Sequence, residues 1–130
     1  MDAPSADELR EARRPLASLL GKSEKALPKL VPGTRQHTML RGNVEALRMA
    51  LALMDGESAD TETPTRADLR TLASMADRAG GAQSKLSPGT SQHTLLRNRL
   101  RGLRVAEALI GARLHDTEAA PGAAADGGGT

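Results

Sequence analysis

The residues of this chain best suited to chemistry are two copies of the tripeptide Gln-His-Thr, which begin at Gln36 and Gln92. If His37 and His93 lay together, their imidazoles could bind a divalent metal or act as an acid/base pair. Neither His has a second His or a Glu at the spacing that metal-binding helices use. We therefore expect a structural role, in which each imidazole covers backbone polar groups in the first turn of a helix, and we predict no bound metal or cofactor.

A second candidate is cationic. Arg97, Arg101 and Arg104 are spaced by four and three residues, so they share one face of a helix. Such a stripe could neutralise the phosphates of a nucleic acid. The alternative is a solvated helix face, partnered by acidic residues elsewhere in the chain. We favour the alternative because the net charge is only +2 and the chain has no aromatic residue on which a base could stack.

Both candidates lie within an internal duplication. Residues 29–54 recur 56 positions later as residues 85–110, with the closest likeness between Pro32–Arg41 and Pro88–Arg97. The likeness extends back to a shared Leu-Ala-Ser at positions 16–18 and 72–74. A unit of this length cannot bury its apolar face alone and must pack on its copy. The duplication therefore predicts two related helical hairpins that share one core.

The helix of the first unit should begin at Ser5, because Glu8 follows three residues later and completes a capping box. Pro15 falls inside the apolar periodicity that follows. Because proline removes a helical hydrogen bond, we expect a kink or a break there and a restart of the helix. Pro28 predicts an irregular final turn.

The remaining helices are placed by caps and by apolar spacing. Thr34 and Thr90 each follow a glycine and should cap helices that run to about Met54 and about His115. In both helices, apolar residues recur at spacings of four and three, which is typical of a seam packed on other helices. Thr65 should start the third helix, with Asp68 closing a weaker capping box.

Small residues beside these seams suggest where helices approach one another. Glycine inside a helix costs about 1 kcal/mol relative to alanine, so Gly42 and Gly102 should be retained for close packing. We expect the second and fourth helices to cross near Ala46 and Gly102, about a pseudo-twofold axis.

One seam position differs between the halves. Glu107 stands where the first half has Leu51. A carboxylate at such a position is costly unless it is exposed or paired. Either this end of the helix is uncovered, or Glu107 meets an arginine in another chain or in this one, or the seam runs in a different register. The candidate partners within the chain are Arg70, Arg78 and Arg104.

The length and composition of the chain limit the number of domains, the makeup of the core and the chemistry that is available. A chain of 130 residues predicts one domain, which we place at residues 1–116. It contains a first repeat at about 5–54, an acidic linker at 55–65 and a second repeat at about 65–115. An Ala/Gly-rich tail at 117–130 should be disordered. The core must be aliphatic, and the absence of cysteine rules out disulfides and thiol chemistry. No apolar run is long enough to cross a bilayer, so we expect a cytoplasmic location.

The sequence thus predicts an all-α, four-helix bundle-like domain with pseudo-twofold symmetry. No nucleophile, paired-carboxylate or phosphate-loop motif is present, so we expect no enzyme activity. By elimination, we expect a non-catalytic interaction module that self-associates or binds a protein partner, with no membrane contact. The alternative is a nucleic-acid-associated regulator that contacts phosphates through Arg97, Arg101 and Arg104.

Overall fold

The computed structural model describes residues 3–56 and 63–119, and within those residues the secondary structure is entirely helical. The elements in order are α1 (Ala6–Ala26), the 3-10 turn η1 (Leu27–Lys29), α2 (Arg35–Met54), α3 (Arg66–Ser84) and α4 (Ser91–Ala119). The all-α prediction is confirmed. Most of the predicted acidic linker and the last eleven residues of the predicted tail lie outside the described residues, whereas α4 extends three residues into the segment that we assigned to the tail.

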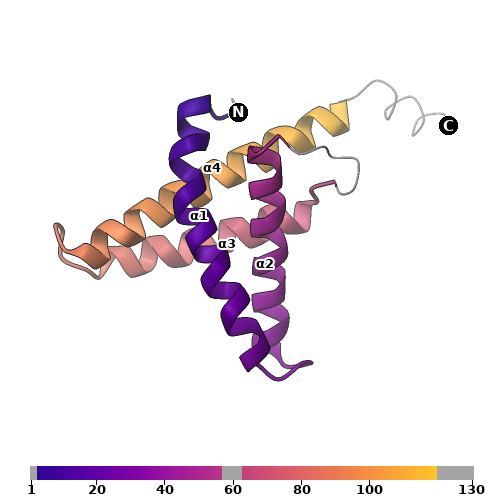
Figure 1. Cartoon of the computed structure of the whole chain (residues 1–130). Helices are drawn as coiled ribbons and strands as arrows, with labels where there is room; N and C mark the ends of the chain where they lie inside the picture. Colours follow the sequence, from indigo (N-terminus) through magenta and orange to yellow (C-terminus); the bar gives the residue numbers. More distant parts are fainter. Residues whose placement is uncertain (1–2, 57–62, 120–130) are drawn as a thin grey trace.

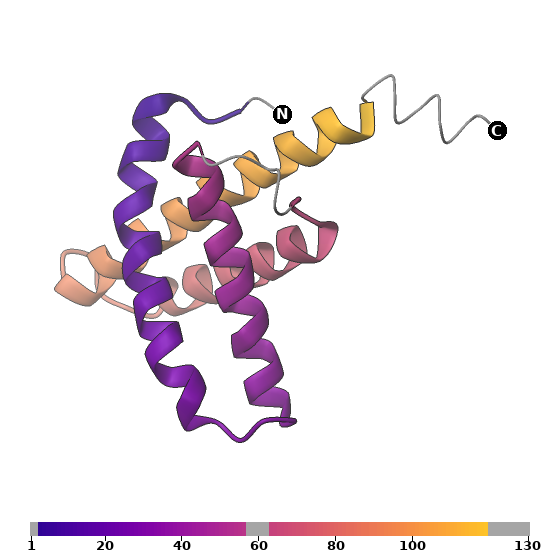
Figure 2. The same ribbon diagram turned by 45° about the vertical axis from the view of Figure 1, so that its right-hand side comes forward.

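The four helices form two hairpins that cross. Figures 1 and 2 show α1 beside α2 and α3 beside α4, with the second pair running across the first. The first helix of each hairpin packs on the second helix of the other, α1 on α4 and α2 on α3, while α2 and α4 touch only marginally. The arrangement is consistent with a helical bundle. Because the shared core lies where the hairpins cross, the tip of each hairpin projects beyond it (Figure 1).

The core is aliphatic, and the duplicated leucines form its centre. Leu16 and Leu72 occupy equivalent positions of the two repeats, as do Leu47 and Leu103, and all four are at most 1% exposed. Ile110 of α4 is also fully buried. Each such side chain contributes roughly 1.5–3 kcal/mol through burial. Equivalent positions of the two repeats therefore supply the buried apolar surface of both hairpins.

The helix starts are set by local side-chain caps. The Ser5 hydroxyl accepts from the Glu8 amide at 3.1 Å, and the Glu8 carboxylate accepts from the Ser5 amide at 2.8 Å. Thr65 and Asp68 exchange the same pair of bonds, at 3.2 and 2.9 Å. Both predicted capping boxes are confirmed.

The prolines of the first helix behave differently from each other. Pro28 lies in η1, so the predicted irregular turn is confirmed. The predicted restart at Pro15 is wrong, because α1 is continuous from Ala6 to Ala26. Proline costs about 3 kcal/mol or more inside a helix. Here the turn that contains it is packed against α4, and this tertiary contact keeps the helix whole.

The predicted crossing of the second and fourth helices near Ala46 and Gly102 is also wrong. A Cβ placed on Gly102 would lie 3.3 Å from the Ala12 carbonyl oxygen and 3.4 Å from the Pro15 ring, so Gly102 permits the approach of α4 to α1. Gly42 permits no close approach, since a Cβ there would meet nothing within 4 Å. Periodicity located the close contact on α4 but could not say which helix it faces.

Candidate functional site

The two most alike parts of the structure are the turns inside the hairpins. Gly33 and Gly89 have φ of +90° and +89°, a conformation that favours glycine. The Thr34 hydroxyl donates to the Val31 carbonyl at 2.7 Å, and the Thr90 hydroxyl donates to the Ser87 carbonyl at 3.0 Å. The duplicated sequence therefore folds into the same turn twice. We call residues 30–39 the first hairpin tip and residues 86–95 the second hairpin tip.

The same threonines start the second helix of each hairpin. Thr34 Oγ1 accepts from the His37 amide at 3.2 Å, and Thr90 Oγ1 accepts from the His93 amide at 3.1 Å. Both caps were predicted from the sequence. They satisfy one of the free amides at each helix start and leave the imidazole rings available for other contacts.

The two imidazoles differ in their surroundings. His93 Nε2 lies 3.3 Å from the Gln83 side-chain amide nitrogen, which donates to it from the last turn of α3. His37 makes no side-chain hydrogen bond to any residue that the structure describes, because Leu27 stands where the second repeat has Gln83. Gln36 and Gln92 are both exposed. A side-chain structural role is therefore visible for His93 alone.

The structure does not bring the two histidines together. His37 lies in the first turn of α2 and His93 in the first turn of α4, and these turns belong to tips that point in different directions in both views (Figures 1 and 2). Within residues 3–56 and 63–119, no group of three or more His, Asp or Glu side chains is arranged to hold a metal ion. The alternative of a shared two-histidine site is therefore not supported.

Sequence reasoning missed a feature of the tips that the structure reveals. Among the described residues, the exposed large aliphatic side chains are Val31, Met39 and Leu95, with exposures of 67%, 49% and 44%. All three lie in the hairpin tips. Met39 and Leu95 occupy equivalent positions of the two repeats. The available signal was that both copies keep an aliphatic residue at a position outside the seam.

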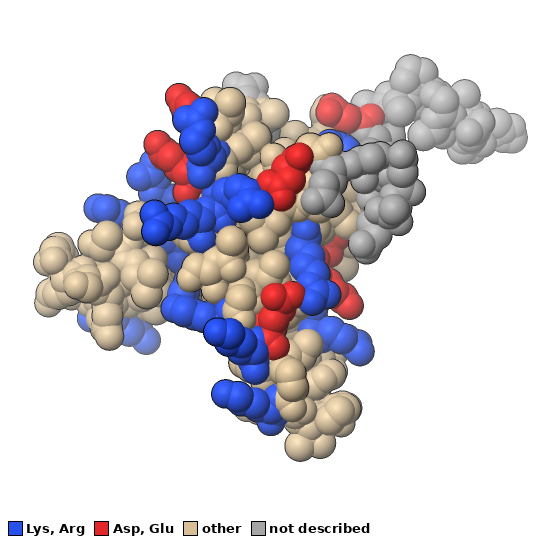
Figure 3. Space-filling view, in the orientation of Figure 1, with Lys and Arg blue, Asp and Glu red and all other residues tan. Residues whose placement is uncertain are grey.

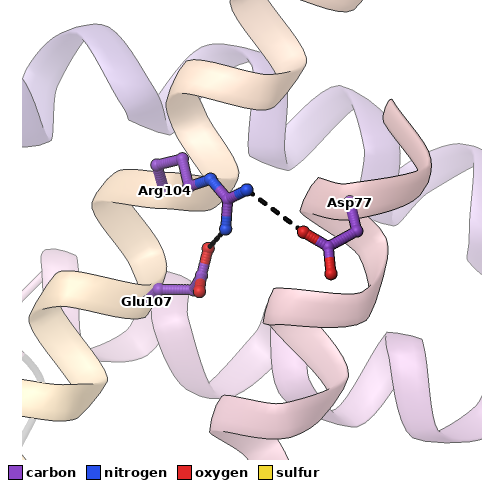
Figure 4. Close-up of polar contacts among 3 residues, drawn as sticks. All are labelled: Asp77, Arg104 and Glu107. Atoms are coloured by element: carbon purple, nitrogen blue, oxygen red, sulfur yellow. Dashed lines mark hydrogen bonds and ion pairs between the residues drawn. The ribbon is translucent and has the colours of Figure 1, made fainter. Parts of the chain in front are cut away.

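The predicted stripe on α4 is mostly engaged within the chain. Arg104 donates to Asp77 of α3 at 3.2 Å and to Glu107 at 2.8 Å (Figure 4). The hydrogen bond to Glu107 raises the pKa of Arg104 above its ordinary value. Arg101 lies 3.7 Å from Glu11 of α1. Arg97 is exposed and has no acidic partner in the described part of the chain.

The arginine that meets Glu107 is one of the three predicted candidates, Arg104. The Glu107 side chain is 19% exposed, so it is mostly removed from water where it replaces the Leu51 of the first repeat. The charge is compensated from its own helix, one turn earlier. Neither an uncovered helix end nor a second chain is needed to account for it.

Ion pairs also link α1 to α2 within the first hairpin. Arg13 of α1 holds Asp55, the C-cap of α2, through two bonds of 2.7 and 2.9 Å. Hydrogen bonding from Arg13 lowers the pKa of Asp55 below its ordinary value. Arg48 of α2 donates to Glu24 at 3.0 Å. On the face drawn in Figure 3, basic and acidic side chains are interspersed, as these pairs require.

Comparison of the chain with models of protein families, with curated proteins and with solved structures gave no match. The features that carry a functional argument are therefore those of the chain itself. None of its described helices combines the length and apolarity needed to cross a membrane. A cytoplasmic location stays a prediction.

Proposed function

We propose that this protein is a non-catalytic helical interaction module that contacts other protein surfaces through its two hairpin tips. The observation that carries the proposal is the equivalent exposure of Met39 and Leu95, at 49% and 44%, on two turns of the same construction. The core holds both tips away from the crossing of the hairpins, where a second molecule can reach them (Figure 2).

The size of the apolar surface suggests weak individual contacts. Burying a side chain such as Met39 that is already half covered contributes less than the roughly 1.5–3 kcal/mol of a fully exposed one. One tip alone would therefore bind weakly. Two equivalent tips on one chain can act together, and linked contacts gain strength without any new interaction.

We take a second copy of this chain as the first partner to test. Identical surfaces can meet in a self-complementary contact, and the duplication gives each chain two such surfaces. Sedimentation velocity over a range from about 10 μM to about 1 mM protein covers the affinities expected of contacts this small. We expect the average mass to rise with concentration.

The decisive variant is the pair Met39→Ser and Leu95→Ser, which should return the mass to that of a monomer. Its matched control is Ala17→Ser, which alters an exposed position in the middle of α1, away from either tip. A chain that stays monomeric throughout would reject self-association. Association that is equally strong in the double variant would reject the tips as the contact.

We also propose that the hairpins are related by an approximate twofold axis. The proposal is supported by the helix pairs, because exchanging the repeats turns the α1 and α4 contact into the α3 and α2 contact, and both exist. The equivalent burial of Leu16 and Leu72 supports it as well. Superposing the two repeats in an experimental structure tests it, and hairpins that do not exchange under one rotation would contradict it.

The alternative function, phosphate contact through the stripe on α4, has weaker support. Arg104 would have to leave Asp77 and Glu107 to reach a phosphate, and Arg101 has Glu11 nearby. A mobility-shift titration at low and at moderate salt tests it, because phosphate contacts make affinity depend steeply on salt. Salt-sensitive binding at micromolar protein that is lost in Arg97→Gln would establish this alternative.

A further inference from the structure

An open groove of about 390 Å³ runs between α2 and α3. Both helices contribute polar side chains to its lining, and no carboxylate is among them. On α3, Arg70, Thr71, Ser74 and Arg78 follow one face of the helix. The groove is therefore positively charged, with hydroxyl groups between its two arginines.

Within the described part of the chain, the groove arginines Arg70 and Arg78 have no carboxylate partner, unlike Arg13, Arg48 and Arg104. Arg70 makes no hydrogen bond or ion pair to any residue that the structure describes. Arg78 donates to the thioether sulfur of Met39 at 3.5 Å, and a thioether is a weak acceptor. Arginine forks bind phosphate and carboxylate oxygens far more strongly. Both side chains thus have unused capacity for an anion.

Asn43 is a further polar side chain of the groove that the described part of the protein does not engage. It is 8% exposed, yet its side chain bonds to no other described residue. No fully buried side-chain nitrogen or oxygen among the described residues lacks a partner. The polar end of Asn43, which lines the groove, therefore keeps some contact with solvent. Solvent in the groove can satisfy this amide, and a ligand that displaces the solvent can hydrogen-bond to it instead.

Gly42 lines the groove and has open space beside it. A Cβ at this position would meet nothing within 4 Å, so the glycine fills no tight helix contact. Glycine in the middle of a helix costs about 1 kcal/mol relative to alanine. The space left by the absent side chain belongs to the groove instead.

We infer that this groove binds a small molecule that carries a diphosphate or a similarly extended, doubly charged oxyanion. Arg70 and Arg78 are eight residues apart, which is about 12 Å along a helix. A single phosphate cannot contact both guanidinium groups over this distance, whereas a longer anion such as a diphosphate can do so when the two arginine side chains extend toward each other. Thr71, Ser74 and Asn43 lie between or opposite them and supply neutral donors. This inference goes beyond the proposed function and does not depend on it.

The test uses the full chain and inorganic pyrophosphate, titrated by calorimetry at constant ionic strength. We expect saturable binding of one pyrophosphate per chain, and orthophosphate to bind about tenfold more weakly because it reaches one arginine at a time. In nuclear magnetic resonance spectra, the side-chain amide of Asn43 should shift as the site fills. Absence of saturable binding, or equal affinity for the two anions, would overturn the inference.

Two variants separate this site from general attraction to positive charge. Arg70→Gln combined with Arg78→Gln should weaken pyrophosphate binding by about a hundredfold, whereas Arg14→Gln on α1, outside the groove, should change it less than about twofold. If Arg14→Gln weakened binding as much as the groove double variant does, the attraction would be an unspecific effect of positive charge. Met39 lines the groove and also belongs to the first hairpin tip, so pyrophosphate binding is measured only in chains that keep Met39. Its loss is then distinguishable from loss of self-association.

A third variant closes the groove without removing charge. Gly42→Leu places a side chain in the groove and should abolish pyrophosphate binding. The thermal midpoint should not fall, because leucine favours the helix more than glycine does. Gly81→Leu is the matched control, since its Cβ also meets nothing within 4 Å but it does not line the groove. Full binding by Gly42→Leu would place the anion elsewhere.

Discussion

Gly102 of α4 lies directly against Pro15 of α1. A Cβ on Gly102 would be 3.4 Å from the proline ring and 3.3 Å from the Ala12 carbonyl oxygen, which is tighter than side chains normally sit. Proline and glycine, the two residue types least favourable in a helix, thus meet at one helix crossing. The missing side chain of Gly102 makes room for the turn of α1 that contains Pro15, and the close packing there offsets part of the cost of both residues.

This contact predicts that leucine substitutions at two different glycines have different effects on the free energy of unfolding. Gly102→Leu should destabilise the protein by about 1–3 kcal/mol through overpacking, because the Ala12 backbone cannot move aside. Gly81→Leu should be neutral or stabilising by up to about 1 kcal/mol. Chemical denaturation of both variants checks the prediction. A Gly102→Leu protein as stable as wild type would mean that α1 and α4 are not closely packed here.

The mostly buried side chain of Glu107 predicts a second contrast, between two substitutions of its ion pair. Arg104→Gln should cost about 1 kcal/mol, because it leaves the mostly buried carboxylate without its ion pair. Glu107→Leu, which restores the residue of the first repeat, should be neutral or stabilising, since hydrophobic replacements of buried ion pairs often are. Thermal unfolding compares them. If Glu107→Leu were the more damaging change, Glu107 would have a role beyond this pair.

Stability should depend on pH through Asp55. Arg13 lowers the pKa of Asp55 in the folded state, so the stabilisation is fully present above the ordinary carboxyl pKa of about 4 and is lost as the pH falls through the lowered value. Wild type should therefore exceed Asp55→Asn in thermal midpoint near neutral pH, and the gap should narrow in acid. Midpoints measured at about pH 6 and about pH 2.5 test this. A gap that is independent of pH would show that the pair does not act in solution.

The two threonine caps should contribute equally to the stability of the protein. Thr34→Ala and Thr90→Ala each remove an acceptor for the amide three residues on, and each should cost about 1 kcal/mol. Because the two turns have the same bonds, the two values should agree within about 0.5 kcal/mol. Urea unfolding provides both numbers. A large difference would mean that one turn has a different geometry in solution.

The two histidines, in contrast, should not contribute alike. His93→Ala loses the bond with Gln83 and should cost about 0.5–1.5 kcal/mol. His37→Ala should stay within about 0.5 kcal/mol of wild type, because His37 bonds to no described side chain. Unfolding of each single variant distinguishes them. Full stability in the absence of both imidazoles would contradict a structural role for either.

The amino-acid sequence by itself determined the helix starts and the content of the core. Ser5, Thr34, Thr65 and Thr90 act on amides three residues away, so their effect can be seen in any short segment. The buried leucines follow from apolar spacing and from the duplication. These features depend only on residues that are close in the chain.

Only the tertiary structure decided which helices meet. Apolar periodicity shows which face of each helix points inward. The same inward faces would fit a crossing of α2 with α4 or a crossing of α1 with α4. The contact of Gly102 with Pro15 shows that α1 crosses α4 at this point. The separation of His37 from His93 and the groove between α2 and α3 follow from that crossing. The physical reason is that contacts between distant segments depend on the relative orientation of whole hairpins, which local spacing does not encode.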